Sequence, residues 1–182
     1  MWFAIHWSPE LSKLTTEPMH DADAILIENK MLSVELLVAD ERWLATMQAG
    51  QVTALLDQIA EKFTEPLGSA NVLLSNDAHV AKLNGQFRQK NEPTNVLSFP
   101  DGDGMRLGDI ILAHETCAQE AKRDDKAFGD HFIHLILHGM LHLLGFDHTN
   151  AKNACEMELL EREILAGLGI PDPYDDETFE LS

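Results

Sequence analysis

The sequence predicts a mixed β-sheet with helices packed on it. Three observations support this fold class. Short apolar runs of strand length alternate with longer segments in which apolar residues recur at helical spacing. Hydrophobic residues make up 45% of the 182 residues, which is enough for a substantial core. No internal repeat and no interdomain linker interrupts the chain, so a single domain is expected.

The first half of the chain contains three short apolar runs that predict strands. They are Ala24–Ile27, Leu32–Ala39 and Asn71–Leu74. Between the second and the third run, apolar residues recur at helical spacing, which predicts a helix over Gln51–Phe63. The sequence Ser75-Asn-Asp77 supplies the N-cap of a further helix over Ala78–Phe87.

The second half begins with a turn at Asn91–Thr94 and a strand over Val96–Phe99, which stops at Pro100. A flexible loop is expected over Asp101–Gly104, followed by a strand over Leu107–Ala113. Three helices complete the pattern, over Glu115–Lys126, Asp130–Leu144 and Glu156–Leu168. Glycines at the end of the last helix and a proline beyond it favour its termination there.

The two ends of the chain differ from its middle. Residues 1–23 are expected to form an irregular extension, residues 24–170 a single domain, and residues 171–182 an acidic, solvated tail. No apolar run approaches the roughly 18 residues of a membrane span, and the start lacks the basic region of a secretory signal. Cys117 and Cys155 form no CxxC pair, which favours a reduced, cytoplasmic protein.

The chain is strongly acidic, with 31 acidic and 13 basic residues and a formal net charge of −18. This balance argues against broad affinity for nucleic acid, because such affinity rests on Lys and Arg side chains that neutralise phosphates. An RNA substrate would therefore need a local basic patch, a metal ion or a basic protein partner. Lys82, Arg88, Lys90 and Arg106 are candidates for such a patch, and each is by default a solvated surface charge.

The segment His138-Gly-Met-Leu-His142-Leu-Leu-Gly145-Phe-Asp-His148 carries three histidines at i, i+4 and i+10. Residues four apart share one face of a helix, so His138 and His142 can offer two imidazoles to one metal ion. Gly145 suits the left-handed conformation that ends a helix, after which the chain can turn back and present His148. Three protein ligands leave one position of a zinc ion open, as in catalytic sites.

The same helix stripe contains two earlier histidines, His131 and His134, so a histidine-rich face without metal is the alternative interpretation. His134 and His138 also make a competing i, i+4 pair. The turn at Gly145 pairs naturally with His142 and not with His134, which favours the metal site described above. His131 and His134 are then expected beside the site or at its entrance.

The spacing matches the H-E-x-x-H-x-x-G-x-x-H zinc motif of the metzincin proteases except at one position. There Gly139 replaces the glutamate that takes a proton from water. Asp147 is expected to cap the turn after the helix or to orient a ligand, and Asp109 to be a buried, hydrogen-bonded support. The sequence therefore predicts a metal site without an evident general base.

Three segments together resemble the YbeY family of bacterial endoribonucleases. They are Leu83 to Arg88 continued by Pro93-Thr94-Asn95-Val96-Leu97-Ser98-Phe99-Pro100, then Leu107-Gly108-Asp109-Ile110, and His138 to His148. The resemblance covers roughly residues 32–168. It implies an α+β fold with a small mixed β-sheet, about five helices, a central histidine-bearing helix and a metzincin-like zinc-site arrangement.

The resemblance also implies a function. It implies a metal-dependent endoribonuclease that prefers single strands and acts in 16S rRNA 3′-end maturation and ribosome quality control. His138, His142 and His148 would hold one Zn2+ per chain, and Arg88 would be catalytic. The partners would be precursor 16S rRNA and the small ribosomal subunit with its proteins, and no membrane.

Two other functions stay open at this point. One is a zinc peptidase of the metzincin type, and the other is a non-catalytic ribosome assembly factor stabilised by zinc. On the residues alone, Arg88 is better interpreted as an ordinary surface arginine or as the ion-pair partner of Glu92. An open fourth metal position favours catalysis over a structural role, because structural zinc sites usually have four protein ligands.

Overall fold

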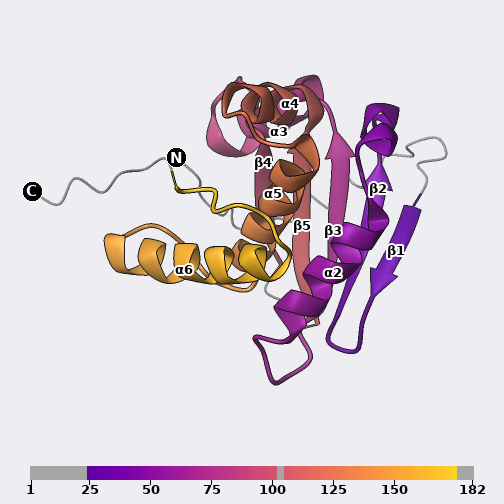
Figure 1. Cartoon of the computed structure of the whole chain (residues 1–182). Helices are drawn as coiled ribbons and strands as arrows, with labels where there is room; N and C mark the ends of the chain where they lie inside the picture. The colour runs from indigo at the N-terminus through magenta and orange to yellow at the C-terminus, as the bar shows by residue number, and fades with distance from the viewer. Residues whose placement is uncertain (1–23, 102–104, 176–182) are drawn as a thin grey trace, which may run out of the picture.

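The computed structural model describes residues 24–101 and 105–175, and these residues form five strands, one 3-10 helix and five α-helices (Figure 1). The strands are β1 (Ala24–Glu28), β2 (Leu32–Val38), β3 (Gly68–Ser75), β4 (Val96–Pro100) and β5 (Arg106–Ala113). The helices are η1 (Glu41–Ala45), α2 (Ala49–Ala60), α3 (Asp77–Arg88), α4 (His114–Arg123), α5 (Phe128–Leu143) and α6 (Ala151–Gly167). The predicted N-terminal extension and residues 102–104 of the predicted loop lie outside the described residues.

The five strands form one mixed sheet in the order β1-β2-β3-β5-β4. The three central strands β2, β3 and β5 run parallel, and the two edge strands β1 and β4 run antiparallel to their neighbours. In the parallel part, Leu36 pairs with Val72 and Val72 pairs with Ile110. The predicted α+β class, the mixed sheet and the five helices are confirmed.

Helices cover both faces of this sheet. Successive residues of a strand point to opposite sides, so neighbouring residues of β3 contribute to different core clusters. Val72 and Leu74 belong to the larger core cluster, which also contains residues of α2, α5 and α6. Leu73 belongs to a smaller cluster with Val80 and Leu83 of α3. The helices α2 and α5 therefore lie side by side on one face, as Figure 1 shows, and α3 covers the other.

Several element boundaries differ from the sequence prediction, and at η1 and α6 a side-chain cap accounts for the difference. The short helix η1 was not predicted, and its N-cap Asp40 accepts a hydrogen bond from the backbone N–H of Arg42. Helix α6 begins at Ala151 and not at Glu156, because the side chain of Asn150 caps it. These turns are set by local polar contacts, which hydrophobic periodicity does not report.

The acidic C-terminal segment was predicted to be solvated, but its first residues contact the domain. Lys126 donates a hydrogen bond to the carbonyl oxygen of Pro173, and Arg162 forms an ion pair with Asp172. The side chain of Tyr174 packs edge-on against His134. Residues 171–175 are therefore held by two cations and an aromatic contact, which acidic composition alone does not predict.

Helix α5 is the central helix, and it packs against β4, β5, α2, α4 and α6. Every residue from Leu135 to Leu143 is buried. Despite this apolar character, α5 has only 16 residues, and none of the described helices is both long and apolar enough to span a membrane. His138 and His142 therefore lie inside the protein core and are held by it.

Candidate metal centre

The last two turns of α5 carry two of the predicted metal ligands, His138 and His142. Both side chains are buried, and their rings meet edge-on with centroids 4.7 Å apart. Their Nε2 atoms lie 3.1 Å from one another. The i, i+4 spacing has thus brought two imidazole nitrogens to a single point, as expected for one face of a helix.

The chain turns back directly after α5 and presents the third histidine. Gly145 has φ +93°, and its N–H and that of Phe146 bond to the carbonyl oxygens of His142 and Leu141. This pair of bonds is the Schellman ending, which favours glycine at the left-handed position. His148 then stacks on His138 with ring centroids 5.6 Å apart. One ligand nitrogen from each of the three histidines lies within 4.8 Å of the others.

In His138 and His142, hydrogen bonds hold the Nδ1 atom, which points away from the other histidines. The lone pair on Nε2 is thereby left for a metal ion. The Nδ1–H of His142 donates to the carbonyl oxygen of Phe146 at 3.0 Å, and a carbonyl can only accept. The Nδ1 of His138 lies 2.9 Å from a carboxylate oxygen of Glu161. The Nε2 of His148 is buried and has no hydrogen-bond partner. Three converging imidazole nitrogens of this kind fit a metal ion.

The electrostatics of the cluster also suit a metal, because ligand histidines must be neutral. Burial and the neighbouring His138 lower the pKa of His142 to about 4. Burial, again with a contribution from His138, lowers the pKa of His148. At neutral pH both rings are therefore uncharged, and no second proton competes with a metal ion for the ligand nitrogen.

Glu161 is a candidate site residue that the sequence alone did not single out. Its carboxylate is completely buried and faces Nδ1 of His138. Burial by itself raises the pKa of this carboxyl, but the neighbouring rings of His134 and His138 outweigh burial and hold the pKa well below its ordinary value. The sequence contained one signal, because Glu161 lies on the same stripe of α6 as the buried Met157 and Ile164. A carboxylate on an apolar helix face requires a partner.

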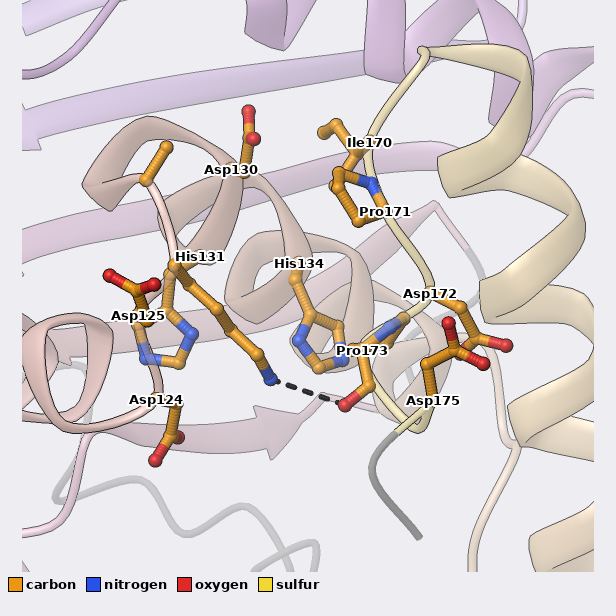
Figure 2. A pocket seen from close by; sticks show the side chains of 12 residues that line it. Asp124, Asp125, Asp130, His131, His134, Ile170, Pro171, Asp172, Pro173 and Asp175 are labelled. Atoms are coloured by element: carbon orange, nitrogen blue, oxygen red, sulfur yellow. Dashed lines mark hydrogen bonds between the residues drawn. The ribbon is translucent and has the colours of Figure 1, made fainter. Parts of the chain in front are cut away.

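The two earlier histidines of α5 face carboxylates and do not join the triad. The Nε2 of His131 lies 3.1 Å from Glu120, and the Nε2 of His134 lies 3.6 Å from Glu161. Figure 2 shows both rings along a cavity of about 260 Å3 between α5 and the segment Ile170–Asp175. His134, His138 and Glu161 form a second group that could hold a metal, but it shares His138 with the triad.

Gly139 faces the sheet and not the triad. A Cβ atom added at this position would lie 2.9 Å from Cδ1 and 3.0 Å from Cγ2 of Ile110. A glutamate here would therefore enter the apolar contact between α5 and β5. The structure thus gives a packing reason for the absence of the metzincin glutamate.

The two aspartates beside the motifs have supporting roles, as expected from the sequence. Asp147 accepts hydrogen bonds from the backbone and hydroxyl of Thr149 and from Asn153, so it caps the turn into α6. These bonds, that of Asn153 foremost, lower the pKa of Asp147 to about 2. Asp109 is buried and accepts hydrogen bonds from Asn71 and Arg106.

The predicted catalytic arginine, Arg88, is the last residue of α3 and is partly buried. Burial lowers the pKa of its guanidinium. Its role toward a substrate stays a prediction. Arg106, which the sequence suggested for a basic patch, is held by ion pairs with Asp101 and Asp109, so its charge is already compensated.

Comparisons with known proteins agree with this geometry. Residues 37–169 match the family model described as Endoribonuclease YbeY. The Endoribonuclease YbeY of Bartonella quintana is 44% identical over 154 residues, which cover 79% of this chain and 98% of that relative. The Endoribonuclease YbeY of Cereibacter sphaeroides is 43% identical over 168 residues, with 78% and 98% covered.

A solved structure supports the fold. The solution structure of TM1509 from Thermotoga maritima aligns with a TM-score of 0.57 at 23% identity, and the match covers 76% of this chain and 89% of that one. At this identity the likeness concerns the fold alone. The family model and the two curated relatives go further: this chain belongs to the YbeY endoribonuclease family.

Proposed function

We propose that this chain is a metal-dependent endoribonuclease that cleaves single-stranded RNA, with a role in 16S rRNA 3′-end maturation and ribosome quality control. The observation that carries the proposal is the convergence of one nitrogen each from His138, His142 and His148 within 4.8 Å. Membership of a family whose curated relatives are named endoribonucleases supplies the reaction class.

We propose one Zn2+ per chain, held by these three histidines. Neutral imidazole nitrogens are ligands that zinc prefers, and three of them leave a position open. When bound, zinc supplies a Lewis acid toward a phosphoryl oxygen and lowers the pKa of a water molecule to about 7. Copper would bind at least as tightly to such a site, so metal availability in the cell decides between them.

The residues of the chain have separate tasks in this proposal. The carbonyl oxygen of Phe146 and the carboxylate of Glu161 orient His142 and His138. Arg88 binds the non-bridging oxygens of the scissile phosphate through its forked guanidinium and stabilises negative charge that develops there. The burial of Arg88 strengthens such an interaction, because a partly desolvated guanidinium gains more from an anion.

A peptidase function receives no support from the same residues. Proteolysis with this zinc arrangement requires a glutamate at position 139 as a base. Gly139 cannot act as a base, and the position is closed by Ile110. The carboxylate of Glu161 faces the outward Nδ1 of His138 and is engaged there.

We also propose that recognition of RNA depends on the small ribosomal subunit in the cytoplasm. The net charge of −18 opposes unaided RNA binding, since the surface as a whole repels phosphates. A basic ribosomal protein would compensate this charge and bring the precursor 16S rRNA to the metal centre. Cleavage is therefore expected to be faster with small subunits than with free RNA.

The test is cleavage of a single-stranded RNA that carries the 16S 3′ precursor sequence, with and without small subunits, alongside an assay of bound metal. His142→Ala is expected to lose both metal and cleavage. Arg88→Ala is expected to keep metal and lose cleavage, and Arg88→Lys to recover only part of it, because lysine lacks the fork. Lys122→Ala removes an exposed cation from the last turn of α4 and serves as the control.

The outcomes separate the proposed roles. Metal binding without cleavage, even with small subunits, would favour the non-catalytic assembly factor. Equal losses of cleavage in Arg88→Ala and Lys122→Ala would reduce Arg88 to a contributor of general charge. Cleavage of casein that a chelator abolishes would revive the peptidase.

A further inference from the structure

The C-terminal segment Ile170–Asp175 lies against the histidine face of α5 (Figure 2). Lys126 donates to the carbonyl oxygen of Pro173 at 3.1 Å, and Arg162 lies 3.1 Å from a carboxylate oxygen of Asp172. The N–H of Tyr174 closes a turn on the same Asp172 side chain. These contacts hold the backbone that leads into Tyr174.

The side chain of Tyr174 contacts Glu161 and His134 beside the metal centre. Its hydroxyl donates a hydrogen bond to Oε2 of Glu161, and its ring lies edge-on to His134 with centroids 6.0 Å apart. The guanidinium of Arg162 lies over the same ring, 5.2 Å from its centroid. Burial and the charge of Glu161 raise the pKa of Tyr174, so the hydroxyl keeps its proton and remains a donor.

Glu161 connects this tyrosine to a metal ligand. Its Oε1 lies 2.9 Å from Nδ1 of His138, and its Oε2 accepts the hydroxyl of Tyr174. Both oxygens of a completely buried carboxylate are thus engaged. A cavity of about 200 Å3 is lined by Tyr174 and Glu161 together with the two histidines His138 and His148. The tyrosine, the carboxylate and two of the triad residues therefore share one local environment.

We propose that Tyr174 is a positioning residue of the metal centre, which holds Glu161 so that Glu161 in turn holds the ring of His138. This inference rests on the proposed metal site. Carboxylates that bind the outer nitrogen of a ligand histidine fix its tautomer and ring orientation, and their loss typically weakens metal binding by about 10–100-fold. Without the hydroxyl, Oε2 would be a buried acceptor with no partner, and the carboxylate would have to turn to find one.

The proposal gives a graded expectation for metal affinity. Glu161→Gln is expected to weaken Zn2+ binding by about 10–100-fold, because it removes the charged acceptor of the Nδ1–H of His138. Tyr174→Phe is expected to weaken it by up to about tenfold, since it acts through Glu161. Lys126→Met is the matched control: it removes another bond to the same segment and leaves the hydroxyl in place.

The experiment uses the full chain. Zn2+ affinity is measured by competition with a chromophoric chelator, and the visible absorption of the Co2+-loaded protein reports the geometry at the metal. Thermal unfolding of the metal-free proteins shows whether each variant folds. A changed Co2+ spectrum and weaker Zn2+ binding in Tyr174→Phe, with Lys126→Met like the wild type, support the proposal.

Two other outcomes overturn it in different ways. If the wild type binds no metal, the proposed metal site fails and this inference with it. If the wild type binds metal and Tyr174→Phe matches it in affinity and spectrum, only this inference fails. Equal losses in Tyr174→Phe and Lys126→Met would also reject it, because the segment would then act by general packing. Glu161→Gln keeps the test decisive should Tyr174→Phe not fold.

Discussion

Each half of α5 carries two histidines on one face of the helix, three residues apart in the first half and four apart in the second, yet the two pairs have different surroundings. His131 and His134 in the first half face the carboxylates of Glu120 and Glu161. His138 and His142 in the second half turn their Nε2 atoms toward each other at 3.1 Å. The difference lies in what the neighbouring elements place opposite each turn of the helix.

Opposite the second half, the Schellman turn at Gly145 delivers His148, whose ring lies 5.0 Å from that of His142. Opposite the first half, α4 delivers Glu120. Helical spacing therefore creates pairs of imidazoles, and the residue that a neighbouring element places opposite a pair decides whether it can form the proposed metal centre. The comparison can be tested by changing each half separately.

The largest effect on metal binding is expected for His142→Ala in the second half of α5. Removal of a proposed direct ligand is expected to weaken metal binding by more than the roughly 100-fold of an outer contact. Metal at 100 times its dissociation constant stabilises a fold by about 2.7 kcal/mol, and this variant should lose that increment. Thermal unfolding with and without EDTA measures both proteins. A variant that still gains stability from metal would show that another group completes the site.

A glutamate introduced into the second half of α5 is expected to lower the stability of the fold, whereas a glutamate in the first half is expected to be tolerated. Gly139→Glu places a carboxylate against Ile110, and an unpaired buried charge of this kind is expected to cost about 3 kcal/mol or more. Gly129→Glu places it in the first turn of α5, where Gln51 alone among the described residues outside the helix lies within 4 Å of an added Cβ and the helix dipole favours an anion. Urea unfolding of both variants checks this contrast. Similar stabilities would mean that the contact of Gly139 with β5 does not constrain the helix.

In the metal-free protein, His142 in the second half of α5 should make the free energy of unfolding depend on pH. The pKa of His142 is about 4 in the fold and 6.5 when exposed, because burial and His138 disfavour its charged form. Between these values the unfolded chain binds a proton that the folded chain does not. The contribution to stability is therefore complete above pH 6.5 and is lost as the pH falls toward 4, by at most about 3 kcal/mol.

Urea unfolding between pH 7 and 4.5 tests this expectation, with His142→Gln as the comparison. The wild type should lose more stability than the variant over this range. Parallel curves for the two proteins would contradict the assignment of this dependence to His142.

The same contrast explains how much of the site could be predicted from the sequence. The three histidines and Gly145 lie within 11 residues of chain, so helix geometry and one turn suffice to bring them together. Glu161 comes from another helix, and its contact with His138 depends on how α6 packs on α5. The only local signal was a carboxylate on the apolar stripe of α6.

In the fold, too, some elements could be predicted from the sequence and others could not. The mixed sheet and five helices could be predicted because strands and helices have distinct hydrophobic periods. The short helix η1 could not, since it is held by the cap of Asp40 and by Trp43, whose indole N–H donates to the carbonyl oxygen of Ser75. Residues 171–175 have the composition of a solvated tail, and they are held on the domain by contacts with residues distant in sequence, namely Lys126, Arg162 and the partners of Tyr174.

The smallest effect is expected in the first half, for His131→Leu. The variant removes one hydrogen bond to Glu120, which keeps the bond from Asn95 at 2.7 Å. It also removes a buried Nδ1 that has no partner, which offsets part of the cost. The expected loss of stability is about 1 kcal/mol, with metal affinity unchanged. A fall in metal affinity comparable to that of His142→Ala would erase the distinction between the two halves, because both would then serve one extended site.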